Sequence, residues 1–266
     1  MKILIVADLH FRRDWLDWLS LRKVDLVVIA GDLLDAFSPD GLLPQMLALS
    51  AWSKDFTLPL AVCSGNHDGN SRGFAFDYNE TLHLSASQKM EAAELVQANR
   101  WMDVLERPGV VVDARSEILT TPAGQIVVTT IPFDFCERPL DIVELWKTGA
   151  TLRKEFRVPW LVLHHEPPAD TTVGGTAGDP HLFYQIRAYR PDYVASGHFH
   201  DQPYRGDFID RLDESWCLNP GCPPVDRKKA AEVPNHILLD LGGRSATWHA
   251  TPRTGNIPIL KTRNLK

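Results

Sequence analysis

The stretch "LAVCSGNHD", residues 60–68, joins an apolar run of strand length to a glycine, an amide, an imidazole and a carboxylate. A buried strand can end in these residues simply to turn, because glycine adopts positive φ and Asn or Asp bonds the local backbone. Asn66, His67 and Asp68 can equally bind a metal ion or move a proton. The ends of the other apolar runs decide between these two interpretations.

Four further apolar runs end in side chains that carry oxygen or nitrogen donors. In chain order, the donors after all five runs are Asp8 and His10; Asp32; Asn66 and His67; His164 and His165; and His198 and His200. Residues two apart on an extended chain point to the same side, so Asp8 and His10 are expected to face one ion. His198 and His200 are expected to face one ion for the same reason. Ligands in open α/β sheets bind beyond the C-terminal ends of the strands, where all five sets can converge.

Apolar runs of strand length alternate with segments of helical period, which predicts an α/β fold with helices covering the sheets. The expected helices are 14–23, 42–54, 86–105 and 140–156, and the expected strands are 2–7, 26–30, 60–63, 110–112, 118–120, 126–131, 160–163, 193–195, 237–241 and 246–249. Several strands of the second half follow one another directly, with "TPAG" as a hairpin turn. This order predicts two sheets rather than one.

The domain organisation is expected to be simple. No internal repeat or linker interrupts the chain, so one domain over residues 1–250 is expected. The tail at 251–266 has Pro, Gly and basic residues without a period, which predicts an extended or flexible segment. The glycine-rich stretch 174–179 is expected to be a plain surface loop rather than a cover over the site.

The bulk composition excludes several classes of partner. With 44% hydrophobic and 23% charged residues, the 266-residue chain has the composition of a soluble globular protein. A formal charge of −6 argues against a broad basic surface for nucleic acid. The four cysteines contain no C-x-x-C pair, which fits a reducing cytoplasm. No stretch approaches the roughly 20 apolar residues of a membrane span, so no membrane partner is expected.

The candidate ligands combine imidazole, carboxylate and amide groups without a thiolate. They are Asp8, His10, Asp32, Asn66, His165, His198 and His200. This donor set favours a catalytic site for Mn, Fe, Zn or Ni over a structural zinc site. Seven donors exceed what one ion usually takes, whereas two ions roughly 3.5–4 Å apart that share a carboxylate would use them all. The histidines outside this set are expected to be structural or exposed.

The order of the motifs is more specific than any one of them. The chain carries D-x-H, GD-x-x-D, GNHD, H-x-P and GH-x-H, each after an apolar run. With this set it resembles the calcineurin-like metallophosphoesterase superfamily from Asp8 to His200, and on through "NPG" at 219–221. The resemblance implies a two-sheet α/β/β/α sandwich with a dinuclear centre at the strand ends. It implies that the first metal is held by Asp8, His10, Asp32 and His200, and that Asp32 bridges to a second metal held by Asn66, His165 and His198.

The same resemblance suggests roles for the neighbouring residues. The family pattern places a ligand two residues before a proline, and Pro167 therefore selects His165 over His164. His67 is then not a ligand but the acid or charge stabiliser beside the metals. Asp68 is expected to orient the His67 ring and favour its imidazolium form, with a simple turn residue as the alternative. Asp35 is expected to be a loop or helix-start residue.

The implied reaction is hydrolysis of a phosphoester, mono- or diester, by a hydroxide that bridges two metal ions. Manganese is the favoured metal, with Fe, Zn or Ni as alternatives, and a small phosphoester is the favoured substrate. A DNA-repair-type nuclease is an alternative, against which the acidic balance and the lack of an evident DNA-capturing module argue. A non-catalytic interaction scaffold is a second alternative, because fold alone does not fix function. Such a scaffold should lack a ligand or the acid imidazole, and this chain has every one.

Overall fold

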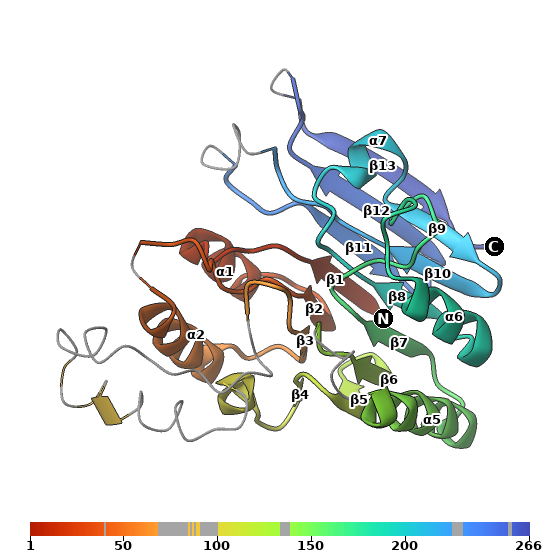
Figure 1. Ribbon diagram of the computed structural model, residues 1–266, viewed down its shortest axis with the longest axis horizontal. Helices are drawn as coiled ribbons and strands as arrows, with labels where there is room; N and C mark the ends of the chain where they lie inside the picture. Colours follow the sequence, from red (N-terminus) through yellow and green to blue (C-terminus); the bar gives the residue numbers. More distant parts are fainter. Residues whose placement is uncertain are drawn as a thin grey trace.

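The structure is a computed structural model. It describes residues 1–39, 41–68, 85, 87, 89–90, 101–133, 139–224, 231–254 and 257–266. Two β-sheets pack face to face within these residues, and helices cover their outer faces (Figure 1). None of the described helices is long and apolar enough to cross a membrane.

The first sheet has seven strands in the order β13-β12-β11-β1-β2-β3-β4. Its strands are β1 (Lys2–Val6), β2 (Leu26–Ala30), β3 (Leu60–Cys63), β4 (Val110–Val111), β11 (His236–Asp240), β12 (Ser245–Ala250) and β13 (Ile259–Asn264). Strands β1 to β4 are parallel, and β11, β12 and β13 continue the sheet in antiparallel pairs. The parallel half therefore presents the ends of β1, β2 and β3 at one edge.

The second sheet has six strands in the order β5-β6-β7-β8-β10-β9. Its strands are β5 (Arg115–Thr121), β6 (Gly124–Thr130), β7 (Trp160–Leu163), β8 (Tyr193–Ala195), β9 (Ile209–Leu212) and β10 (Ser215–Leu218). The inner strands β6, β7, β8 and β10 are parallel, and the two edge strands are antiparallel to their neighbours. The register Thr121↔Gly124 places Pro122 and Ala123 in the β5–β6 turn, as "TPAG" predicts.

The longer helices lie on the two outer faces, whereas Tyr204 of a short helix packs against the core between the sheets (Figure 1). They are α1 (Arg13–Ser20), α2 (Leu43–Asp55), the 3₁₀ helix η1 (Trp101–Leu105), α5 (Pro139–Phe156), α6 (Pro180–Tyr189) and the short α7 (Gln202–Arg205). Helices α1 and α2 pack on the first sheet, and α5 and α6 pack on the second. This arrangement confirms the α/β/β/α sandwich.

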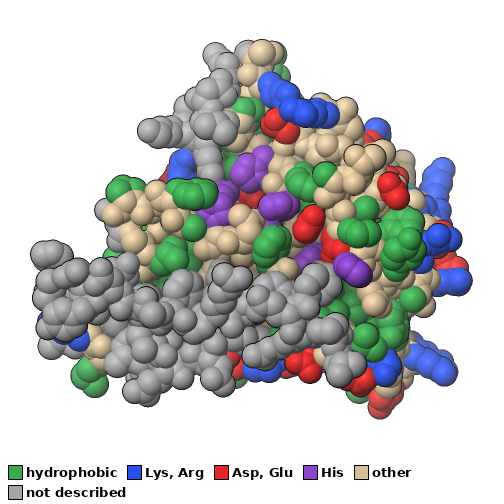
Figure 2. All heavy atoms as spheres, in the orientation of Figure 1, with side chains coloured by type: hydrophobic (Ala, Val, Ile, Leu, Met, Phe, Trp, Pro, Cys, Tyr) green, Lys and Arg blue, Asp and Glu red, His purple; other side chains and the backbone are tan. Residues whose placement is uncertain are grey.

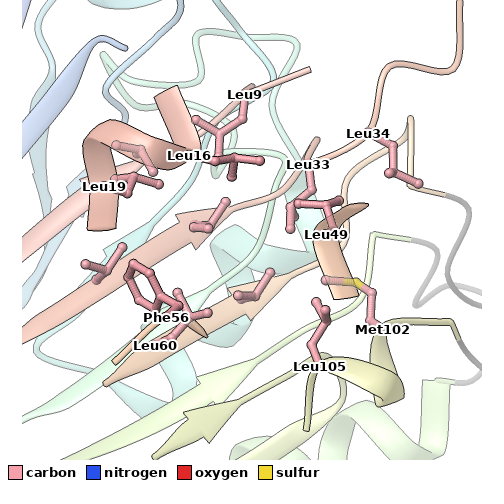
Figure 3. Close-up of a cluster of buried hydrophobic side chains, with 14 of the residues drawn as sticks. Leu9, Leu16, Leu19, Leu33, Leu34, Leu49, Phe56, Leu60, Met102 and Leu105 are labelled. Carbon is pink, nitrogen blue, oxygen red and sulfur yellow. The ribbon is translucent and has the colours of Figure 1, made fainter. Parts of the chain in front are cut away.

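Alternation along each strand divides the side chains between three hydrophobic layers. In β1, Leu4 and Val6 pack under the helices, whereas Ile3 and Ile5 face the second sheet. Figure 3 shows the outer layer of the first sheet, where side chains of α1 and α2 meet the strands. Each fully buried Leu, Ile or Val contributes about 1.5–3 kcal/mol relative to its exposed state. The strands are therefore fixed from both faces, and their ends are held in register.

Three helices and most strands confirm the sequence prediction, with boundaries that differ by a few residues. The 86–105 helix is described only at residues 87, 89–90 and 101–105, and the last five form η1 rather than a turn of α-helix. The rest of that prediction lies outside the described residues. The sequence patterns gave no signal for α6, β9 or β10.

The C-terminal segment corrects the expected domain boundary at residue 250. Residues 259–264 form β13, which pairs with β12 over six positions from Ser245↔Asn264 to Ala250↔Ile259. An edge strand is held by backbone hydrogen bonds on one side and has an open face, so it needs no hydrophobic period. A chain that lacks a period is therefore compatible with a strand, which is why the pattern predicted a loose tail.

Candidate metal centre

The loops that follow the parallel strands lie side by side. After β1 and β2, the Asp8 N–H donates to the Gly31 carbonyl at 3.1 Å and the His10 N–H donates to the Asp32 carbonyl at 2.9 Å. After β7 and β8, the Gly197 N–H donates to the His165 carbonyl at 2.8 Å. Because the two sheets pack across one shared core, these loops meet at a common edge of the sandwich.

Two buried aspartates form the middle of the site. Asp8 Oδ1 lies 3.1 Å from His200 Nε2 and 3.8 Å from His165 Nε2. Asp32 Oδ2 lies 3.3 Å from His165 Nε2 and 3.9 Å from His10 Nε2. His165 therefore stands between the two carboxylates, and the five side chains form one cluster.

Asn66 connects the remaining histidine to this cluster. Its Oδ1 lies 3.2 Å from His165 Nε2 and 2.9 Å from His198 Nδ1. All seven side chains that the sequence singles out are thus joined by contacts shorter than 4 Å. Figure 2 shows histidine side chains gathered on this face of the molecule. The structure brings the predicted ligands together, and their binding of metal stays a prediction.

The backbone at the site adopts an uncommon conformation. Asp8, His10, Asp32 and His198 have φ values of 55°, 44°, 53° and 62°. Few residues other than glycine adopt positive φ, and such residues cluster at functional sites. This corrects the expected cause of convergence. The pairs 8/10 and 198/200 do not lie on extended chain, because β1 ends at Val6 and β8 at Ala195. Tight turns beyond the strands, and not strand alternation, aim these side chains.

The glycines of two motifs allow this close approach. A Cβ on Gly31 would lie 2.3 Å from His165 Nδ1, and a Cβ on Gly65 would lie 2.2 Å from Asp32 Oδ1. Both distances are far below any van der Waals contact. Gly31 of "GD" therefore leaves room for His165, and Gly65 of "GNHD" leaves room for Asp32, each a candidate ligand from another loop.

The charges of the cluster are strongly coupled. Burial alone would raise the pKa of Asp8, but His200, His165 and His10 hold it below its usual range. Burial likewise opposes the charge on Asp32, and His165 lowers the pKa of that carboxyl. Burial would lower the pKa of His165, whereas Asp32 and Asp8 raise it to about 9. The centre thus contains two buried carboxylates that are stabilised by positive charge.

These residues fit a metal centre. Asp8 Oδ2 is buried and accepts no hydrogen bond within the described part of the chain, an arrangement that a cation would satisfy. Three groups have donor atoms within 4.8 Å of one another: Asp8, His10 and His200; Asp8, Asp32 and His165; and His10, Asp32 and His67. Asp8 and Asp32 each belong to two of these groups. A carboxylate shared between two groups is what two adjacent metal ions would require. Imidazole and carboxylate donors without a thiolate are ligands for Mn, Fe, Zn or Ni.

His67 stands beside the cluster with a defined tautomer. The Ala36 N–H donates to His67 Nδ1 at 3.1 Å, so Nδ1 is an acceptor and Nε2 carries the proton. Nε2 lies 3.9 Å from Asp32 Oδ2. The exposed ring of Phe37 packs edge-on against His67, with ring centroids 5.0 Å apart. The described geometry therefore directs Nδ1 of His67 at the backbone and Nε2 toward the metal centre.

The contacts of Asp68 correct its predicted role. Its Oδ1 accepts the Leu34 N–H at 2.9 Å and its Oδ2 accepts the Gly65 N–H at 2.7 Å. Burial and the charge of Asp32 raise the pKa of Asp68 to about 8. Asp68 therefore ties two loops together, which is the turn-residue alternative, and does not orient His67. The carboxylate near His67 is that of Asp35, whose Oδ1 lies 3.9 Å from Nδ1.

Asp35, the second aspartate of "GDLLD", is a loop residue, as the sequence predicted, and its position beside His67 comes from the structure alone. Asp35 Oδ1 also accepts the Phe37 N–H at 3.0 Å, so one side chain fixes the turn beside His67.

The two adjacent histidines after β7 face different surroundings. His165 faces the cluster, as predicted, with Nδ1 2.7 Å from the Ala30 carbonyl oxygen. His164 is buried and points away, with Nε2 3.5 Å from Asp179 Oδ2 and Nδ1 3.3 Å from the Ile131 carbonyl oxygen. The side chain of His164 therefore connects the metal loop to the segment that precedes α6.

That segment, residues 170–179, corrects the expectation of a plain surface loop. Gly174 to Ala177 line a cavity of about 550 Å³ together with His198 and His200. The buried Asn219 of "NPG" contributes to the support of both walls. Its Nδ2 lies 3.3 Å from the Val173 carbonyl oxygen and 3.2 Å from that of Gly197. The sequence marked Asn219 only as part of a motif, and its contacts show that it connects the loop to the metal centre.

Solved structures of similar fold come from diverse organisms. TT1561 of Thermus thermophilus has 16% identity and a TM-score of 0.54, covering 100% of this chain and 99% of that chain. GAP50, the anchor in the inner membrane complex of Plasmodium, has 12% identity and a TM-score of 0.51, covering 100% and 89%. A purple acid phosphatase from yellow lupin (Lupinus luteus) seeds has 13% identity and a TM-score of 0.50, covering 94% and 51%. At these identities the likeness shows the fold alone. No curated protein matches the chain.

The family assignment follows from the sequence model as well as from the site. The model of the calcineurin-like phosphoesterase family matches residues 1–202, which include all seven candidate ligands and His67. The chain therefore belongs to the calcineurin-like phosphoesterase family.

Proposed function

We propose that the protein is a dinuclear metal-dependent phosphoesterase that acts on small phosphoesters. The observation that carries this proposal is the cluster of seven donor side chains around the buried Asp8 and Asp32. Asp8, His10, Asp32 and His200 would hold one ion, and Asp32, Asn66, His165 and His198 would hold the other. Manganese is the favoured metal, with Fe, Zn or Ni as alternatives.

The metal pair, when bound, would lower the pKa of the attacking water and neutralise charge on the phosphoryl oxygens. The chain orients the ligands for this task. The ring nitrogen Nδ1 of His165 is directed at the Ala30 carbonyl, which leaves Nε2 for the centre. The Asp8 carboxylate accepts the backbone N–H of His198 at 3.2 Å. This hydrogen bond connects Asp8, a proposed ligand of one ion, to His198, a proposed ligand of the other.

His67 would supply the proton for the departing alcohol. Its Nδ1 accepts the Ala36 N–H, so the proton stays on Nε2, which faces Asp32 and the centre. With Nε2 facing the centre, His67 would donate a hydrogen bond to the leaving oxygen and then its proton as the P–O bond breaks.

The compartment is part of the same proposal. Cys63 and Cys217 are buried free thiols, and Cys136 lies outside the described residues. Free thiols support a reducing compartment such as the cytoplasm.

The test combines metal content with a hydrolysis screen. Protein reconstituted with Mn is assayed on a phosphomonoester, a phosphodiester and DNA, beside Asp32→Ala and the exposed control Asp17→Ala. We expect two ions per chain in the unchanged protein and in the control, and a loss at both positions in Asp32→Ala, because Asp32 is expected to bridge. Two retained ions in Asp32→Ala would contradict the bridge.

The screen also separates the alternatives. Hydrolysis of DNA alone would favour a nuclease. Absence of bound metal and of turnover with every metal would favour a scaffold.

A further inference from the structure

A cavity opens directly beside the candidate metal centre. Its volume is about 550 Å³, and its lining includes the predicted ligands His198 and His200. Cavities of roughly 300–1,000 Å³ hold organic molecules of drug size. A bare phosphate would leave most of this space unfilled. The cavity is therefore large enough for an organic group attached to the reacting phosphorus.

The wall opposite the ligands is a tightly anchored loop. The Thr172 N–H donates to Asp210 Oδ2 at 2.6 Å, and Gln202 Nε2 donates to the Thr172 carbonyl at 3.1 Å. The Asp179 N–H donates to the Pro167 carbonyl at 2.8 Å, which closes the base of the loop. These bonds join the wall to the metal loop and to β9, so the cavity is pre-formed.

Among the residues that the structure describes, the lining is neutral overall. Its formal charges there are those of Asp201 and Arg205, which form an ion pair at 3.3 Å. Asp201 also pairs with Arg253 at 2.8 Å, outside the lining. The remaining lining combines the Phe199 ring, two prolines and small residues with Thr and Gln side chains. Such a surface suits an uncharged group that has a flat apolar part and a few hydrogen-bonding atoms.

The cavity reaches the centre at His198 and His200, whereas the proposed proton donor contacts the centre at His10 and Asp32. The ring of His10 contacts His67 with centroids 4.6 Å apart, and it contacts His200 with centroids 5.4 Å apart. His200 lines the cavity, whereas neither His67 nor His10 does. The departing oxygen must lie at His67 to receive its proton. A group in the cavity is therefore the one that stays on phosphorus.

We infer that the substrate is a phosphodiester, and that the cavity binds the retained, uncharged organic group of about nucleoside size. This inference rests on the proposed function. Water adds its oxygen to phosphorus and loses one proton, the P–O bond on the His67 side breaks, and the leaving oxygen takes the Nε2 proton. The products are an alcohol and a phosphomonoester that carries the retained group, and His67 regains its proton from solvent.

The test keeps the leaving group constant and varies the retained group. The Mn-loaded full chain is assayed on p-nitrophenyl phosphate, methyl p-nitrophenyl phosphate and the p-nitrophenyl ester of thymidine 5′-phosphate. We expect kcat/KM for the thymidine diester to exceed that for the methyl diester by at least about tenfold, a difference that small contacts in a preformed pocket supply. Thymidine 5′-phosphate is expected to inhibit more strongly than methyl phosphate, because it is the product that occupies the cavity.

Ala177→Phe narrows the cavity from its exposed wall, and Ala123→Phe in the β5–β6 turn is the matched control. We expect Ala177→Phe to lower the thymidine-to-methyl ratio by about tenfold or more, and the control to retain it. Thr176→Phe, at the neighbouring exposed position, provides a second variant if the first does not fold.

The outcomes separate this inference from the proposed function. Turnover of both diesters with equal kcat/KM, or a ratio unchanged in the folded cavity variants, would overturn the cavity assignment alone. Faster turnover of the monoester than of either diester would overturn the diester assignment. Failure to hydrolyse any p-nitrophenyl ester would overturn the proposed function and this inference with it.

Discussion

The core strands and the loops that follow them differ in almost every physical respect. Strands β1, β2, β7 and β8 are apolar, regular and buried on both faces. The loops beyond their ends contain buried charge and several non-glycine residues of positive φ, among them four candidate ligands, a conformation of order 1–3 kcal/mol above the common ones. Because the strands are fixed by packing, the loops can hold a conformation that they would not adopt alone. Variants in the two regions should therefore affect different properties.

The largest expected effect on stability is in the core. Trp160→Ala removes a fully buried indole of β7 that packs on Trp146 and donates from Nε1 to Thr129 Oγ1 at 2.9 Å. We expect about 3–5 kcal/mol lower unfolding free energy, measured by urea denaturation, because a cavity remains and Thr129 Oγ1 loses one of its hydrogen bonds. Tyr184→Ala, at an aromatic that is 67% exposed, is the control and should change stability little.

A variant of the proposed acid should show the opposite pattern. His67→Ala is expected to lower kcat about 10²–10⁴-fold, the usual contribution of a positioned acid, with an unchanged melting temperature. Metal content should stay at the level of the unchanged protein, because His67 is assigned as a proton donor. Loss of one ion in His67→Ala would instead show that His67 is a metal ligand. Its donor atom lies close enough to those of His10 and Asp32 for this role.

The glycines at the boundary between the regions test the cause of convergence. Gly31→Ala places a methyl group 2.3 Å from His165 Nδ1, whereas Gly109 has a similar φ of +83° and nothing within 4 Å of a Cβ. Both substitutions share the backbone strain of positive φ, about 1 kcal/mol. We expect Gly31→Ala to lower metal content and activity as well, measured by elemental analysis and hydrolysis. Equal metal content in the two variants would show that the approach of His165 to Gly31 does not matter.

The smallest predicted effect lies far from the metal centre and concerns pH. Burial and the stacked His249 ring lower the pKa of His236 from its ordinary 6.5 to about 4. The unfolded chain therefore takes up this proton first, so stability is full above pH 6.5 and falls as the pH drops from 6.5 toward 4. His236→Asn should remove about 2 kcal/mol of this dependence, measured by denaturation at pH 7 and pH 4.5.

An unchanged slope in His236→Asn would contradict the assignment of the proton to His236.

The roles of Asp68 and Asp35 show the limit of local patterns. "GNHD" puts Asp68 next to His67 in the chain, yet the Asp68 carboxylate bonds the backbone of Leu34 and Gly65. Asp35 is 32 residues before His67 in the chain and lies 3.9 Å from its ring. Sequence neighbours on a tight turn point in different directions, so adjacency does not predict contact.

The sequence by itself determined the apolar strands, the two-sheet order and the seven donors, because hydrophobic periodicity and a polar residue at a strand end are local signals. Tertiary structure alone decided which carboxylate lies beside His67, to which backbone group Nδ1 of His67 is directed, and that loop 170–179 walls a cavity. Each of these depends on contacts between segments that are far apart in the chain. The edge strand β13 belongs with them, since only its pairing with β12 distinguishes it from a tail.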